Sequence, residues 1–132
     1  MAITHSIDTT RGIVTLVYGS EPDFETWRAA VEAVFADPLY RPGMGFLADR
    51  RAVSQPPDRD YLRSITKYVN RQGDRVGVSR WALVVTTPEA YGGVPIGHTF
   101  LEGDSIEVAV FLDVAAAERW LGREPGPEAA ER

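Results

Sequence analysis

Short apolar runs alternate with segments of helical period along this chain, and this alternation limits the fold more than any other feature of the sequence. The apolar or β-branched runs cover residues 13–18, 44–48, 81–85 and 106–112. Between and after them lie three segments whose apolar residues recur every three or four positions. Strands that alternate with helices form sheets with parallel members joined by crossover helices. The sequence therefore predicts an α/β domain with a mixed sheet.

The first part of the chain predicts a hairpin followed by a helix. A turn sequence at 10–12 can bring the first apolar run back onto an earlier strand at 5–8. Ser20 and Asp23 have the spacing of a capping box, which predicts the start of a helix. Because proline disfavours helix in the residue before it, this helix should end near Asp37.

The second part of the chain predicts two more helices and one irregular segment. A helix over residues 58–72 has Gly73 as its stop signal, and a last helix begins at Asp113 and runs through Leu121. Glycines and a proline interrupt residues 88–103, which we interpret as a broken helix. The expected total is about five strands and about four helices.

The size of the chain indicates one domain. At 132 residues it has no linker and no internal repeat, so we expect a single domain over 1–122 and a flexible tail at 123–132. The absence of cysteine excludes disulfides and thiolate metal ligands and favours a reducing, cytoplasmic location. The N-terminus shows no signal-peptide pattern, and no apolar run approaches the roughly 18 residues of a membrane span.

Several short residue patterns follow one another at characteristic spacings. They are Phe46-Leu47-Ala48-Asp49, Trp81-Ala82-Leu83-Val84-Val85, and Phe111-Leu112-Asp113 with Ala117 and Trp120-Leu121 behind it. In this order they resemble the SpoIIAA-like branch of the STAS family, the sulfate transporter and anti-sigma factor antagonist domains, over residues 12–122. The resemblance implies a non-enzymatic, partner-binding domain without a cofactor, whose architecture is related to that of the CRAL-TRIO lipid carriers.

The resemblance also implies a place to look for phosphorylation. STAS domains that antagonise anti-sigma factors carry a phosphorylatable serine in an Asp-Ser-Ser/Thr-Gly pattern, between the third strand and the second helix. Here Arg50 and Arg51 follow Asp49, so the pattern is missing and a phosphorylation switch is not indicated. Ser54 is the nearest hydroxyl and the candidate phosphosite, although most loop serines serve turns.

The sequence offers few groups for catalysis. His5 and His98 lie far apart, so we expect no zinc site, and no serine stands in a Gly-x-Ser-x-Gly pattern. His98 with Tyr91 or Glu102 forms the acid-base set that an enzyme would use here. A loop histidine is the simpler interpretation, and we predict that the protein is not an enzyme and binds neither metal nor cofactor.

The charge of the predicted helix at 58–72 suggests a function. The chain has a net charge of −5, yet residues 41–80 hold nine Lys or Arg against four Asp. Cations recur every fourth residue of the helix and form one slanted basic stripe, at Arg59, Arg63, Lys67 and Arg71. Arg50 and Arg51 could enlarge it. The simpler alternative is a solvated face whose cations pair with nearby aspartates.

If the stripe is functional, it predicts docking of an acidic protein partner or an anionic headgroup. Nucleic acid is less favoured, because the overall charge is acidic and the sequence lacks the aromatic-interleaved basic face of single-strand binders. A homodimer is left open.

Aromatic residues suggest a second hypothesis. The predicted helices and the segment at 88–103 are rich in them, and those of interest are Trp27, Tyr61, Tyr68, Tyr91 and Phe100. Aromatics at helical spacing usually belong to the core. If residues 91–100 instead cover an apolar cavity, the protein would carry a small hydrophobic ligand or a lipid.

Overall fold

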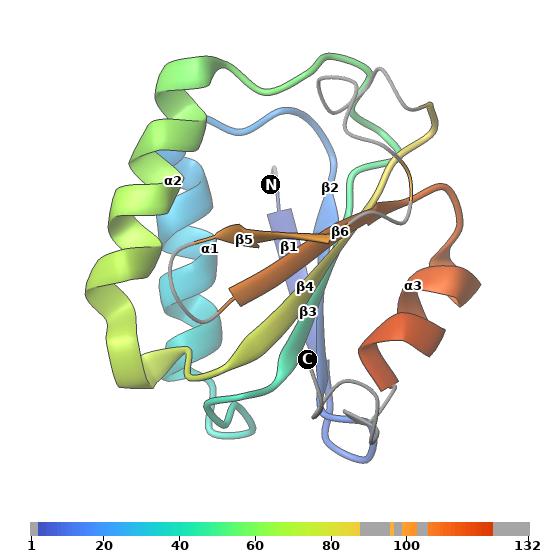
Figure 1. The fold of residues 1–132 in the computed structure, drawn as a ribbon. Coiled ribbons are helices and arrows are strands. Elements are labelled where there is room, and N and C mark those ends of the chain that lie inside the picture. The colour runs from blue at the N-terminus through green and yellow to red at the C-terminus, as the bar shows by residue number, and fades with distance from the viewer. Residues whose placement is uncertain (1–2, 88–95, 97–98, 103–105, 123–132) are drawn as a thin grey trace.

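The computed structural model describes residues 3–87, 96, 99–102 and 106–122, which form a sheet with helices on both faces (Figure 1). The strands are β1 Ile3–Asp8, β2 Ile13–Tyr18, β3 Gly45–Asp49, β4 Ser79–Val84, β5 Thr99–Glu102 and β6 Ile106–Phe111. The helices are α1 Phe24–Ala36, α2 Arg59–Gln72 and α3 Val114–Gly122, and a 3-10 turn, η1 Gly73–Arg75, follows α2. Helices α1 and α2 cover one face of the sheet and α3 covers the other.

The sheet is mixed, as the sequence predicts. Its strand order is β1-β2-β3-β4-β6-β5. The four inner strands β2, β3, β4 and β6 are parallel, and the two edge strands β1 and β5 are antiparallel to their neighbours. Parallel strands need crossover connections, and α1 and α2 supply two of them. The α/β class and the opening hairpin are therefore confirmed.

The interpretation of residues 88–103 as a broken helix is wrong for the four residues of β5. Thr99–Glu102 pairs with β6, so that Phe100 lies opposite Val108. The run Thr99-Phe100-Leu101-Glu102 holds a β-branched and an aromatic residue, which are common in strands. The described residues hold six strands and three α-helices, where about five and about four were expected. The tail at 123–132 lies outside the described residues.

The helix ends follow local chemistry. Helix α1 is capped by Asp23, whose side chain accepts a hydrogen bond from the Thr26 amide at 2.7 Å. The capping box expected at Ser20 does not form, because Pro22 disfavours helical geometry in the residue before it. Helix α1 ends at Ala36, and α2 ends at Gln72 with Gly73 as its C-cap, whose φ of +50° suits glycine, as predicted.

The core has two layers because successive strand residues point to opposite faces. In β4, Trp81 and Leu83 join the large cluster under α1 and α2, whereas Ala82 and Val84 face α3. Trp120 of α3 packs on Phe111 with ring centroids 5.5 Å apart, so this helix covers its face of the sheet.

The parallel strands bring their carboxyl ends to one edge of the sheet, where α1, α2 and α3 begin. Side chains near this edge therefore meet the first turns of the helices. In open α/β sheets this edge is where ligands bind.

Candidate functional site

The outer face of α2 carries the predicted basic stripe. Its four cations are exposed, and the inner face of the helix holds Tyr61, Ile65, Tyr68 and Val69. Four residues correspond to one turn plus about 40°, so the stripe rises along the helix with one cation per turn. The predicted placement of Arg59, Arg63, Lys67 and Arg71 is confirmed.

Three of the four stripe cations lack a counter-ion in the described part of the chain. Arg63 approaches Asp60 at 3.4 Å, but both side chains are well exposed and such pairs contribute little. Among the described residues, Arg59, Lys67 and Arg71 make no ion pair. The alternative, a face whose cations are taken up by neighbouring aspartates, therefore applies to one of the four.

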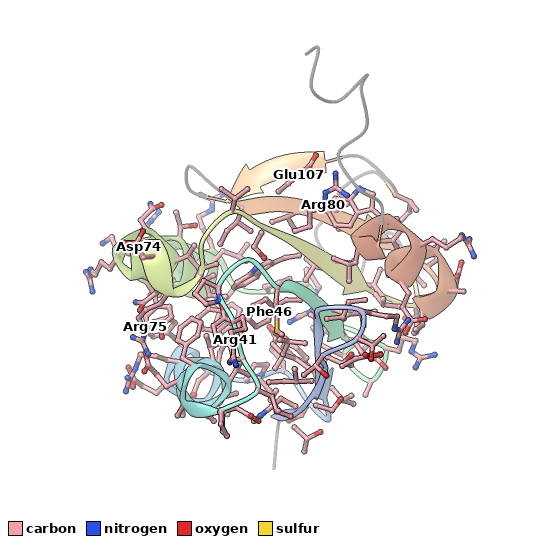
Figure 2. The ribbon with its side chains drawn as sticks, turned by 90° about the horizontal axis from the view of Figure 1, so that it is seen from below. Arg41, Phe46, Asp74, Arg75, Arg80 and Glu107 are labelled. Atoms are coloured by element: carbon pink, nitrogen blue, oxygen red, sulfur yellow. The ribbon has the colours of Figure 1, made fainter. Side chains whose placement is uncertain are left out.

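Most other cations between residues 41 and 80 are held by carboxylates, whereas Arg41 donates to the backbone carbonyls of Pro38 and Tyr40. Three of these ion pairs have N–O distances of 2.8, 2.8 and 3.3 Å and join Arg51 to Asp49, Arg75 to Glu32, and Arg80 to Glu107. Figure 2 shows Arg75 between α1 and α2, and Arg80 beside Glu107 on the sheet. The Arg75 and Arg80 side chains also lie over the Phe35 and Trp120 rings. The cations left to meet a partner are mainly those of α2.

Arg50 does not belong to the exposed surface, so its place in the predicted docking site is wrong. The residue is 2% exposed, and its Nη2 donates to Glu21 Oε2 at 2.6 Å. Its backbone N–H donates to the carbonyl of Val84 in β4, so the pairing between β3 and β4 continues one residue beyond Asp49. The alternation that buries Phe46 and Ala48 under α1 and α2 therefore turns Arg50 inward too.

Arg51 is exposed but lies outside the stripe. Both of its side-chain hydrogen bonds go to the carboxylate of Asp49, two residues earlier. This guanidinium lowers the pKa of the Asp49 carboxyl. Ser54 lies in the same loop and is exposed to solvent.

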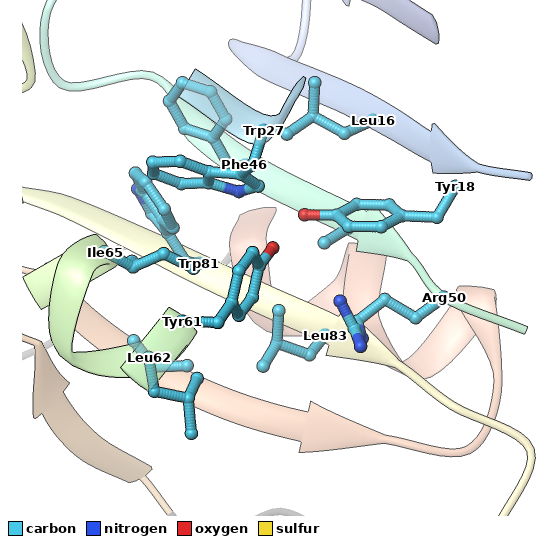
Figure 3. A pocket seen from close by; sticks show the side chains of 12 residues that line it. Leu16, Tyr18, Trp27, Phe46, Arg50, Tyr61, Leu62, Ile65, Trp81 and Leu83 are labelled. Atoms are coloured by element: carbon cyan, nitrogen blue, oxygen red, sulfur yellow. The ribbon is translucent and has the colours of Figure 1, made fainter. Parts of the chain in front are cut away.

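A cavity of about 40 Å³ lies between the sheet and the first turns of α2 (Figure 3). Trp27 and Tyr61, two of the predicted pocket residues, line it. Tyr68 packs edge-on against Trp27 and donates to Glu32. Tyr91 lies outside the described residues, as does the side chain of Phe100. The predicted cover at 91–100 is therefore untested, and the cavity described here lies under α2.

The cavity is apolar except for a few polar groups. Arg50 forms part of its wall, and the hydroxyls of Tyr18 and Tyr61 point toward one another inside it (Figure 3). Burial raises the pKa of Tyr18, so its hydroxyl stays protonated at neutral pH. The indole Nε1 of Trp81, another wall residue, is buried and has no hydrogen-bond partner among the described residues.

An open groove of about 390 Å³ adjoins this cavity, between the starts of α1 and α2. Tyr61 lines both spaces, and Glu21 reaches from the groove to Arg50 in the cavity wall. The Glu21–Arg50 ion pair therefore stands where the two spaces meet.

The candidate acid-base set stays untested by the described part of the chain. His98 and Tyr91 lie outside it, and the described residues contain no cluster of side chains suited to a metal ion. None of the helices seen has the length and apolar character that a bilayer crossing requires. Comparison of the chain with protein-family models, curated proteins and solved structures finds no match. The STAS resemblance stays a prediction.

Proposed function

We propose that this chain is a non-catalytic binding domain that docks an acidic segment of a protein partner on the basic stripe of α2. The observation that carries the proposal is the contrast among neighbouring cations. Arg51, Arg75 and Arg80 each have a carboxylate partner, whereas Arg59, Lys67 and Arg71 have none among the described residues.

The stripe costs stability. Like charges four residues apart destabilise a helix by about 0.2–0.5 kcal/mol per pair, and the stripe contains three such pairs. The helix tolerates about 1 kcal/mol of repulsion because its inner face is buried in the core. An acidic partner would turn this repulsion into attraction.

Charge distribution restricts where an acidic partner can dock. The residues outside 41–80 carry five Lys or Arg against fifteen Asp or Glu. An acidic segment is therefore repelled by most of the chain and steered toward the basic stripe of α2. The stripe extends over about 18 Å, which matches a segment with one carboxylate per helical turn.

The resemblance to STAS domains points in the same direction, because those domains bind protein partners through this part of the fold. The resemblance does not identify the partner of this chain. The proposal therefore depends on the charges of α2, and the experiment has to test them.

The test measures binding of a synthetic helical peptide of about 12 residues, with Glu at every fourth position, to ¹⁵N-labelled protein. We expect shift changes that concentrate on residues 59–71 and weaken with added salt. Arg63→Glu with Lys67→Glu should weaken binding about tenfold or more, because two attractions become repulsions. The melting temperature should change little, because both side chains are exposed.

Arg119→Glu is the matched control for Lys67→Glu, because Arg119 is also an exposed helical cation but lies on α3, across the sheet. It should leave the affinity unchanged. Equal weakening by both single variants would show that net charge alone drives binding and would contradict the proposal. So would binding of anionic phosphatidylserine vesicles through the stripe without binding of the peptide.

A further inference from the structure

We propose that the cavity under α2 binds a small monocarboxylate, and that the ligand carboxylate takes the position on Arg50 that Glu21 now occupies. The site differs from the docking surface, which lies on the opposite face of the same helix. The proposal goes beyond partner docking, because it assigns a ligand class to the interior of the domain.

The buried cation determines the ligand charge. The Arg50 side chain is 3% exposed, and a buried guanidinium needs an anion close by to remain stable. Its planar fork of N–H donors fits a carboxylate better than other small anions of one charge. The 2.6 Å contact with Glu21 shows that a carboxylate oxygen fits at this position.

Glu21 can leave this position more easily than Arg50 can. It lies in the connection between β2 and α1, and its side chain is 30% exposed, so it can turn toward water. Arg50 follows β3 directly, its backbone is held by Val84, and its guanidinium lies over the Tyr18 ring at 5.0 Å. A ligand would therefore displace the glutamate and leave the arginine in place.

The neighbouring groove offers a path for the ligand. Glu21 and Tyr61 line the groove, and Tyr61 and Arg50 line the cavity, so breaking the ion pair opens one space to the other. Asp23, Asp58 and Asp60 also lie along the groove, but each stands at the N-cap or in the first turn of a helix, whose partial positive charge offsets it.

The size of the cavity determines the ligand body. One water needs about 10–15 Å³ on this measure, so the cavity accepts about three groups of that size beside the carboxylate. Leu16, Ile65 and Leu83 give it apolar walls, and the hydroxyls of Tyr18 and Tyr61 can donate to the second carboxylate oxygen. A branched acid with three carbons beyond the carboxyl, isobutyrate, meets these requirements.

The experiment titrates isobutyrate and its uncharged isostere isobutyramide into ¹⁵N-labelled protein. We expect shift changes at the cavity residues with isobutyrate and none with isobutyramide. Glu21→Gln should tighten isobutyrate binding about threefold or more, because it removes the internal competitor. Arg50→Met should weaken it about tenfold or more, because a charge-assisted bond is lost.

Leu62→Trp provides a second variant if Arg50→Met does not fold. Among the described residues that line the cavity, Leu62 alone is not fully buried, so a larger side chain there can block the space and leave Arg50 intact. It should also abolish binding. Unchanged affinity in Glu21→Gln, equal binding of the acid and the amide, or shift changes confined to the exposed stripe would each overturn the proposal.

Discussion

Replacing Glu21 by Gln should lower the free energy of unfolding, because it removes the negative charge that pairs with the buried Arg50. Removing one partner of a buried ion pair costs about 3–5 kcal/mol. Here the carboxylate is 30% exposed and glutamine retains a hydrogen-bond acceptor, so we expect a loss of about 2 kcal/mol in the free energy of unfolding. For a 132-residue domain this corresponds to a fall of about 6–10 °C in the melting temperature.

Glu25→Gln is the control for this change. Glu25 pairs with Arg28 at 2.8 Å, close to the 2.6 Å of the Glu21–Arg50 pair, but the Arg28 side chain is 43% exposed where that of Arg50 is 3% exposed. We expect no resolvable change in the urea midpoint of this variant, because water solvates the arginine that remains. The comparison isolates burial of the cation, since the substitution and the contact distance are nearly the same.

A double substitution tests the reasoning by the sign of its effect. Combining Arg50→Met with Glu21→Gln removes the buried charge together with its partner, and Met suits the apolar surroundings of the cavity. The double variant should be more stable than Glu21→Gln alone in urea unfolding at pH 7. If it is less stable, or if Glu21→Gln matches the wild type, Arg50 does not carry an uncompensated buried charge and the argument fails.

Two other features of the fold make predictions about stability. Arg75 and then Tyr68 hold the pKa of Glu32 below its ordinary 4.5, so the wild type should lose this contribution as the pH falls from about 4.5 through the lowered pKa. Glu32→Gln should therefore be less stable than the wild type in urea at pH 7, and the difference should be smaller at about pH 3; an equal difference at both pH values would contradict the assignment. Gly77→Ala should cost more than Gly12→Ala in the same assay, because both have φ near +70° but only at Gly77 would a Cβ lie 3.2 Å from the Gly43 nitrogen. Equal losses would show that the close approach has no effect.

Periodicity in the sequence predicts the part of the candidate site that lies on one element. The stripe of α2 follows from cations at every fourth residue and needs only the helix to form. The same reasoning finds the hairpin, the parallel strands and the ends of α2. These features depend on neighbours in the sequence.

Position in the sequence groups Arg50 with the other cations and so predicts the wrong place for it. Period two along the strand was the available signal, since Phe46 and Ala48 point to the α1 and α2 face and Arg50 is next in that series. No comparable pattern in the sequence predicts the cavity. Its walls come from α1, α2 and four strands, so their meeting depends on tertiary packing. Strand β5 was missed because four residues after a glycine-rich segment give too short a pattern to separate strand from helix.

The basic stripe runs along the whole of α2, whereas the cavity lies under its first half, and that half has the least internal support. Asp58 at its N-cap makes no side-chain hydrogen bond to the first turn, and the cavity lies directly beneath Tyr61 and Ile65. The other half is held more firmly, because Tyr68 packs against the rings of α1.

Repulsion along the stripe acts on both halves of α2. It should destabilise the first half more, because that half is less firmly packed. A carboxylate ligand from inside and an acidic partner from outside would each supply what this half of the helix lacks. The first fills the space beneath it, and the second neutralises the charges on its surface.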